Sequence, residues 1–121
     1  MQKNILKAKI ILETLPYIQR FTKKTIVIKY GGSAQINPDL KEKFAQDIVL
    51  LNLVGIKTAI IHGGGKKINE LLSKLEIKSE FQDGLRVTSD ESMDVVEMVL
   101  SGNINKEITS LLNRHGAKAI G

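Results

Sequence analysis

The chain has 121 residues, 42% of them hydrophobic, which suits one globular domain that buries roughly two-thirds of its unfolded surface. It has no cysteine, two histidines and no apolar run of about 18 residues, so disulfides, thiolate metal sites and membrane spans are excluded, and we expect no metal site. The net charge of +5 comes from basic residues scattered among acidic ones, and 4% of residues are aromatic, which argues against nucleic acid and favours anionic small molecules.

The first predicted element is an amphipathic helix over residues 4–21. Its apolar side chains recur at spacings of three and four, at Ile5, Ala8, Ile11, Leu15 and Ile18. Pro16 is expected to kink or interrupt this helix, because proline lacks a backbone N–H and its ring clashes with the preceding turn. The apolar stripe predicts either packing against a partner or folding back onto the rest of the domain.

Two successive units of strand, glycine-rich turn and helix follow. The predicted elements are a strand over 25–28, a loop over 31–37, a helix over 38–54, a strand over 57–61, a turn over 62–65 and a helix through 75. Asn37 can cap the first of these helices with Pro38 as its first residue, and Gly55 can end it. Such alternation predicts an α/β fold with right-handed crossovers and a mainly parallel sheet between helices.

The pattern loosens after residue 75, where a hairpin around Asp83-Gly84 and an irregular loop remain alternatives. Thr88-Ser89-Asp90-Glu91 has the spacing of a capping box that opens a helix. Gly102-Asn103 is expected to interrupt that helix, and Gly116 to end the one that follows. Residues 117–121 are predicted to start a strand, and a chain that stops inside an element is expected to be a fragment.

The two glycine-rich turns, Lys29-Tyr30-Gly31-Gly32 and His62-Gly63-Gly64-Gly65, are the candidate ligand site. Ligands of parallel sheets bind beyond the carboxyl ends of strands, where glycine lets the backbone approach an anion. Lys29 would reach this edge as a point charge for phosphate. The alternatives are glycines that only make tight turns and a solvated strand-end lysine. His62 is expected to pack beneath its turn, and Lys66-Lys67 to form a solvated first helical turn.

Together with Gly84-Leu85-Arg86-Val87-Thr88, these two turns occur in an order and at separations that resemble the amino-acid kinase superfamily and, within it, the N-acetylglutamate kinases. The similarity covers essentially the whole chain. It implies a carbamate kinase-like three-layer sandwich and a cytoplasmic enzyme of arginine biosynthesis. The implied reaction transfers the γ-phosphoryl group of ATP to the side-chain carboxylate of N-acetyl-L-glutamate, giving N-acetyl-L-glutamyl 5-phosphate, with Mg²⁺ held mainly by the nucleotide phosphates.

The resemblance also implies roles for individual residues. Lys29 would stabilise the transferring phosphoryl group, and Gly31 and Gly32 would face the ATP phosphates. Gly64 and Gly65 would donate backbone N–H groups to the substrate, whose α-carboxylate Arg86 would grip. Without the resemblance, Arg86 reads as a surface arginine of a hairpin. The acceptor carboxylate is already ionised, so the reaction needs no general base.

The resemblance also implies a division of the chain into two parts. Residues 1–22 resemble, through Leu15-Pro16-Tyr17-Ile18, the extra helix by which arginine-inhibited members join dimers into a hexamer and build part of the L-arginine site. Residues 23–121 would be an incomplete N-terminal acetylglutamate-binding lobe without the C-terminal nucleotide-binding lobe, and the 121-residue chain alone would be inactive. The alternatives are an aminoadipate-type or aspartate kinase and a non-catalytic regulatory or oligomerising module.

Overall fold

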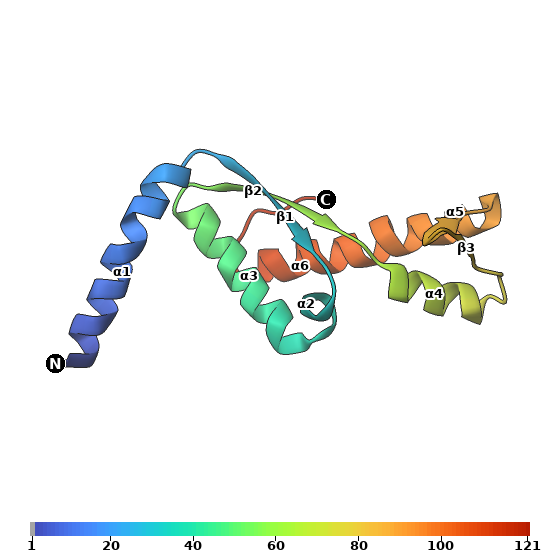
Figure 1. Cartoon of the computed structure of the whole chain (residues 1–121), viewed down its shortest axis with the longest axis horizontal. Coiled ribbons are helices and arrows are strands. Elements are labelled where there is room, and N and C mark those ends of the chain that lie inside the picture. The colour runs from blue at the N-terminus through green and yellow to red at the C-terminus, as the bar shows by residue number, and fades with distance from the viewer. Residues whose placement is uncertain (1) are drawn as a thin grey trace.

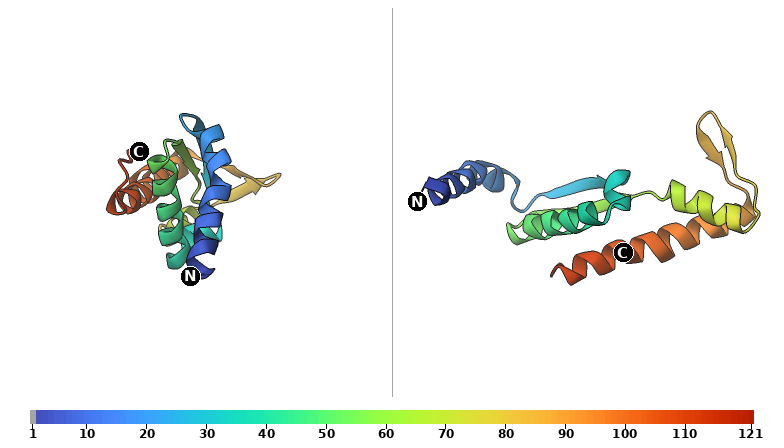
Figure 2. Two further views of the ribbon diagram at one scale, coloured as in Figure 1. Left: turned by 90° about the vertical axis from the view of Figure 1, so that its left-hand side faces the viewer. Right: turned by 90° about the horizontal axis from the view of Figure 1, so that it is seen from below.

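A computed structural model describes residues 2–121 of the chain. Its elements are α1 (Gln2–Phe21), β1 (Thr25–Tyr30), α2 (Ser33–Ile36), α3 (Pro38–Leu53), β2 (Lys57–His62), α4 (Gly65–Lys74), β3 (Glu80–Gln82), β4 (Leu85–Val87), α5 (Asp90–Glu97), the π-helix η1 (Met98–Ile104) and α6 (Asn105–Arg114). The molecule is elongated, with α1 at one end and the β3–β4 hairpin at the other (Figures 1 and 2). None of the described helices is long and apolar enough to cross a bilayer.

The expected parallel pairing is confirmed by β1 and β2, which run side by side with α3 as the crossover between them (Figure 1). Alternate residues of both strands are partly or fully buried, as period-two side-chain alternation requires. The helices α3 and α6 pack on each other, and α3 packs on β2. On the opposite face Val27 and Ile61 remain 61% and 59% exposed, so the described residues build two layers of the expected three-layer sandwich.

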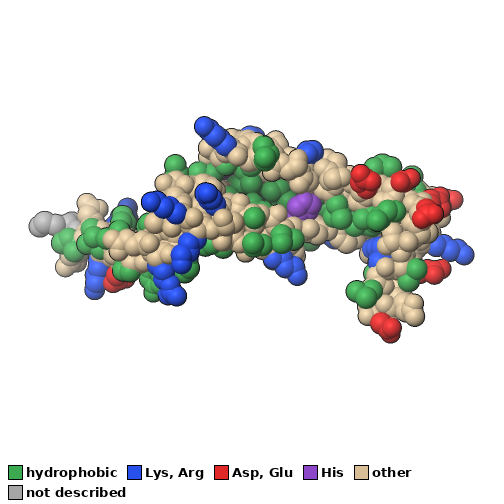
Figure 3. Space-filling model, turned by 90° about the horizontal axis from the view of Figure 1, so that it is seen from above, with side chains coloured by type: hydrophobic (Ala, Val, Ile, Leu, Met, Phe, Trp, Pro, Cys, Tyr) green, Lys and Arg blue, Asp and Glu red, His purple; other side chains and the backbone are tan. Residues whose placement is uncertain are grey.

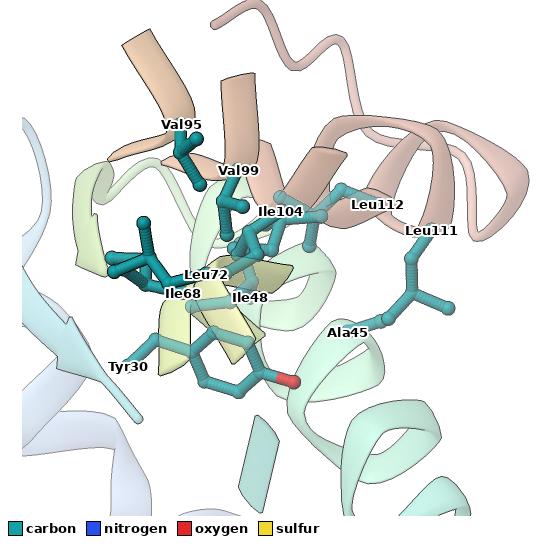
Figure 4. Close-up of a cluster of buried hydrophobic side chains, with 11 residues drawn as sticks. Tyr30, Ala45, Ile48, Ile68, Leu72, Val95, Val99, Ile104, Leu111 and Leu112 are labelled. Atoms are coloured by element: carbon teal, nitrogen blue, oxygen red, sulfur yellow. The ribbon is translucent and has the colours of Figure 1, made fainter. Parts of the chain in front are cut away.

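The core lies between the sheet and the helices. Its buried side chains are Tyr30, Ala45, Ile48, Ile68, Leu72, Val95, Val99, Ile104, Ile108, Leu111 and Leu112. Figure 4 shows them converging from β1 and from helices that are far apart in the sequence. The Tyr30 ring stacks on Phe44 with 4.0 Å between ring centroids, and its hydroxyl donates to the carbonyl oxygen of Ala34 at 2.8 Å. Tyr30 therefore anchors the end of β1 directly beneath the first glycine turn.

The first two helices bear on two expectations, an interruption at Pro16 and a loop over residues 31–37. Pro16 lies inside α1 without interrupting it. No described residue of α1 is buried, so water can hydrate the carbonyl group that the missing N–H leaves free. The loop expected over residues 31–37 contains the short helix α2. The predicted cap of α3 is confirmed, because the Asn37 side chain accepts a hydrogen bond from the Leu40 backbone N–H at 3.2 Å.

The second half of the chain decides between a hairpin and an irregular loop, and it places the N-cap of α5 at a different residue from the one expected. The hairpin is present, with β3 and β4 antiparallel and both Asp83 and Gly84 at positive φ, as a two-residue hairpin turn requires. The capping-box prediction at Thr88 is wrong. Ser89 caps α5 by accepting a hydrogen bond from the Ser92 backbone N–H at 3.2 Å, because the helix begins one residue later than the expected spacing.

The predicted break at Gly102-Asn103 is also wrong, since α5, η1 and α6 continue as one helical stretch whose middle widens into a π-helix. Gly116, at a φ of 93°, ends that stretch as predicted. Residues 117–121 form no strand. They run near β2, but a cavity of about 390 Å³ lies between the two segments, so no ladder of backbone hydrogen bonds forms there.

Candidate anion-binding site

The register of the parallel sheet brings the two glycine turns together. Tyr30 pairs with His62, so the residues that follow them leave the sheet at the same edge. A cavity of about 550 Å³ lies there, lined by Gly31-Gly32, by Gly63–Gly65 and by the four lysines Lys29, Lys41, Lys66 and Lys67. Glu70 is the carboxylate among its lining residues. Beside the apolar side chains of Ile36 and Ile104, the cavity therefore offers lysine ammonium groups and glycine backbone, which are donors suited to an anion.

Glycine is required at different positions of the two turns for different structural reasons. Gly32 has a φ of 60°, which disfavours a side chain, while a Cβ on Gly31, Gly63 or Gly65 would meet nothing within 4 Å. Gly64 is packed: a Cβ there would lie 2.4 Å from Ile104 Cδ1. The open glycines leave space for a ligand to reach the backbone, whereas Gly64 allows η1 to pack against the second turn.

The two turns are linked by a side chain that no sequence motif marks. Gln35, on α2, donates a hydrogen bond from Nε2 to the carbonyl oxygen of Gly63 at 2.9 Å. Helix α4 begins at the end of the second glycine turn, and its N-cap residue, Gly64, makes no side-chain cap bond. The first backbone N–H groups of α4 are thus available at the cavity, at the positive end of the helix dipole.

The lysines of the cavity belong to a network that reaches α6. Glu107 forms ion pairs with Lys41 and with Lys67, the latter at 2.8 Å, and Lys67 also donates to Asn103 Oδ1 at 3.0 Å. These hydrogen bonds from Lys41 and Lys67 lower the pKa of Glu107, against the opposing effect of burial. The sequence predicts a solvated Lys67, whereas in the structure its ammonium group is paired with Glu107 and Asn103. Lys29 makes no ion pair with any described residue.

Arg86 is not among the residues that line this cavity. Its guanidinium donates to the Asn69 side chain on α4 and to the Ser79 hydroxyl, and it stacks 4.7 Å from the centroid of the Phe81 ring. The structure thus holds Arg86 against α4, and it does not bring Arg86 together with Lys29 and the glycine turns in one cavity.

His62 belongs to a different environment. It is half-buried, and its Nδ1 atom is buried without a hydrogen-bond partner among the described residues. It lines the cavity of about 390 Å³ between β2 and residues 117–120, together with Asn105, whose Oδ1 also lacks a partner there. This position agrees with a histidine packed below the turn rather than one that faces the candidate site.

Charge is unevenly distributed over the molecule. In the view of Figure 3 most acidic side chains gather at the end that carries the β3–β4 hairpin, while lysine and arginine side chains prevail toward α1. The cavity between the turns is likewise richer in lysine than in carboxylate. An anion that approaches the sheet edge therefore meets a local excess of positive charge.

Comparison with known proteins places this geometry in a family. A sequence profile of the amino acid kinase family matches residues 24–121. The acetylglutamate kinase of Campylobacter fetus subsp. fetus is 67% identical over 121 residues, which are 100% of this chain and 43% of that protein. The acetylglutamate kinase of Aliarcobacter butzleri is 68% identical over 115 residues, 95% of this chain and 38% of that protein. The chain thus spans less than half the length of these relatives.

Solved structures agree with this result. The smu.665 protein from Streptococcus mutans UA159 superposes with a TM-score of 0.70 at 32% identity, covering 79% of this chain and 38% of that one. N-acetylglutamate synthase from Neisseria gonorrhoeae, complexed with coenzyme A and N-acetyl-glutamate, has the same TM-score of 0.70 at 23% identity. The match covers 91% of this chain and 26% of the synthase chain, and it supports a shared fold only. The profile match and these likenesses establish that the chain belongs to the amino acid kinase family.

Proposed function

We propose that this chain is the acetylglutamate-binding lobe of a cytoplasmic enzyme of arginine biosynthesis. The enzyme would transfer the γ-phosphoryl group of ATP to the side-chain carboxylate of N-acetyl-L-glutamate. The observation that carries the proposal is the cavity in which two glycine turns and four lysines meet. Relatives named acetylglutamate kinase, 60–68% identical to this chain, support it. The chain spans 43% of most of these relatives, and we propose that the nucleotide-base pocket lies in the remaining length.

The proposed chemistry brings two anions together. The acceptor carboxylate is ionised at neutral pH, so the protein needs to align it with the phosphoryl group and to offset their mutual repulsion. Lys29 would supply the positive charge for the transferring phosphoryl group. Backbone N–H groups of Gly31 and Gly32 would face the ATP phosphates, and those of Gly64 and Gly65 would face the acceptor.

Magnesium would accompany the nucleotide. The charged residues that line the cavity are four lysines and one glutamate, Glu70, a set that fits phosphate oxygens better than a bare cation. No group of three or more His, Cys, Asp or Glu residues that could hold a metal ion occurs within residues 2–121. We propose that Mg²⁺, when bound, is held mainly by the phosphates and neutralises part of their charge.

Arg86 would bind the α-carboxylate of the acceptor. Its guanidinium spends two donors on Asn69 and Ser79, and a guanidinium has five N–H donors, so others remain for a carboxylate. The two neutral acceptors and the Phe81 ring fix the plane of the group. Arg86 lies outside the cavity between the turns, so this role requires the acceptor to extend from that cavity toward the hairpin.

We further propose that α1 joins copies of the protein. None of its described residues is buried, and Ile5, Ile11 and Tyr17 are each more than 60% exposed. The helix does not fold back onto the rest of the domain, which leaves its apolar side chains for a partner. Pairing of this helix between dimers would give a hexamer, and L-arginine would bind near it as a feedback inhibitor.

The test is a phosphorylation assay on a protein that carries this chain within the full length of its relatives. N-acetylglutamate, aminoadipate and aspartate would be offered as acceptors to the wild type, to Lys29→Ala and to the control Lys57→Ala, which alters an exposed lysine at the other end of the sheet. We expect selective phosphorylation of N-acetylglutamate and a loss in kcat of about 10²–10³-fold for Lys29→Ala alone. Near-normal turnover of Lys29→Ala would contradict the mechanism.

A further inference from the structure

Glu107 connects three helices at the wall of the anion cavity. It extends from α6, where its side chain is 39% exposed, to the ammonium groups of Lys41 on α3 and Lys67 on α4. Both lysines line the cavity between the glycine turns, whereas Glu107 is not among the lining residues. Glu107 therefore holds the two lysines without itself lining the cavity.

The hydrogen-bond inventory leaves donors free for a ligand. Each ammonium has three N–H donors. Lys41 spends one on Glu107, and Lys67 spends one on Glu107 and one on Asn103. Within residues 2–121, three of the six donors are thus unused and remain for a group in the cavity. Lys29, Lys66 and Glu70 are the other charged residues that line it, so the wall stays positive even after Glu107 is counted.

We propose that Lys41 and Lys67 bind the phosphate oxygens of the anionic ligand, and that Glu107 is the positioning residue that holds both lysines at the cavity wall. The inference rests on the proposed function, because it takes the same cavity as the phosphate site. A free lysine side chain loses about 2 kcal/mol of rotamer entropy when it is fixed. Two lysines that are already held by one carboxylate lose less of it when the ligand binds.

Two other roles of Glu107 predict a different change in anion affinity when its charge is removed. If Glu107 acted only as a negative charge near the site, its neutralisation would strengthen the binding of an anion. If it only tied the three helices together, its removal would change stability and leave the affinity of the folded protein unchanged. The affinity of Glu107→Gln for an anion therefore separates the three possibilities.

The experiment measures binding of inorganic tripolyphosphate to a protein that carries this chain within the full length of its relatives, by calorimetry at low ionic strength, where exposed lysines are least screened. Glu107→Gln keeps the side-chain shape and should bind about threefold more weakly than wild type. The control Glu97→Gln removes the same charge from an exposed residue of α5 that does not line the cavity, and should bind as wild type does. Thermal unfolding establishes that each variant is folded.

A double-mutant cycle tests whether Glu107 acts through the lysines. In a Lys41→Met/Lys67→Met background, whose own affinity should fall on the order of tenfold, Glu107→Gln should have no further effect. Equal or tighter binding by Glu107→Gln, or an undiminished effect in that background, would overturn the inference and leave the proposed function standing. Failure of the wild-type protein to bind tripolyphosphate would overturn the inference, whereas the phosphorylation assay decides the proposed function separately. If Glu107→Gln does not fold, Lys67→Met alone must weaken binding for the inference to survive.

Discussion

Gly64 and Ile104 fit together only because Gly64 lacks a side chain. A Cβ on Gly64 would lie 2.4 Å from Ile104 Cδ1 and 3.0 Å from Leu100 Cδ2, and Ile104 is 2% exposed and has little room to move. We expect Gly64→Ala to lower the free energy of unfolding by about 1–3 kcal/mol through overpacking. Urea denaturation measures this change.

Two further variants make that prediction specific. Gly65→Ala is the matched control, since a Cβ at Gly65 meets nothing within 4 Å and alanine favours the first turn of α4. Ile104→Val removes the clashing Cδ1 atom, so it should recover part of the stability in the Gly64→Ala background although it costs stability alone. Additive losses in the double variant would show that the contact is not the cause.

Local chemistry made much of this fold predictable. Asn37-Pro38 predicted the cap of α3, and Asp83-Gly84 predicted the hairpin turn as one of two alternatives, because both signals depend on residues that are neighbours in the chain. The repeated strand, glycine turn and helix likewise predicted a parallel sheet with both turns at one edge.

Features that depend on distant partners were not predictable in the same way. The π-helix η1 has no local sequence signature, and Gly102-Asn103 inside it resembles an ordinary helix break. The pairing of Lys41 with Glu107 spans 66 residues, so only the packing of α3 against α6 reveals it. The resemblance implies that Arg86 binds a substrate carboxylate, whereas its partners in the structure, Asn69 and Ser79, follow from how the hairpin folds toward α4.

The lowered pKa of Glu107 links the lysine network to acid stability. A carboxyl group whose pKa is lower in the folded state stabilises the fold at pH values above its unfolded pKa, about 4.3, and loses this contribution as pH falls through the folded pKa. We expect wild type to exceed Glu107→Gln in stability near pH 7, and the gap to close in acid below about pH 4. A gap that stays constant down to pH 2 would show that the ion pairs are not its source.

The hydroxyl of Tyr30 should matter at the base of the first turn. It donates to the Ala34 carbonyl oxygen at 2.8 Å, and Tyr30→Phe would remove that bond at a cost of about 0.5–1.5 kcal/mol. Tyr17→Phe is the control, because Tyr17 is 65% exposed. Chemical denaturation at neutral pH should show a loss for Tyr30→Phe only, and equal effects of the two substitutions would contradict this role.

The same tyrosine predicts a response to alkali. Burial, and secondarily the negative charge of Glu107, raise the pKa of Tyr30. A raised folded-state pKa gives stability that is complete below the unfolded pKa, about 10, and is lost as pH rises through the folded value. Wild type should therefore lose stability above about pH 10 more steeply than Tyr30→Phe does. Parallel alkaline curves for the two proteins would rule out this linkage.

The exposed helix α1 predicts how the protein assembles. Ile11 and Leu12 are 68% and 66% exposed, and a helix this apolar on its surface should bury these side chains against a second copy. We expect Ile11→Glu to shift sedimentation toward smaller species, because an ionised carboxylate would have to be buried in the contact. The control Gln19→Glu places the same charge on an exposed polar position of α1 and should leave the assembly intact. The opposite result, in which Gln19→Glu and Ile11→Glu sediment alike, would mean that the apolar side chains of α1 do not form the contact between copies.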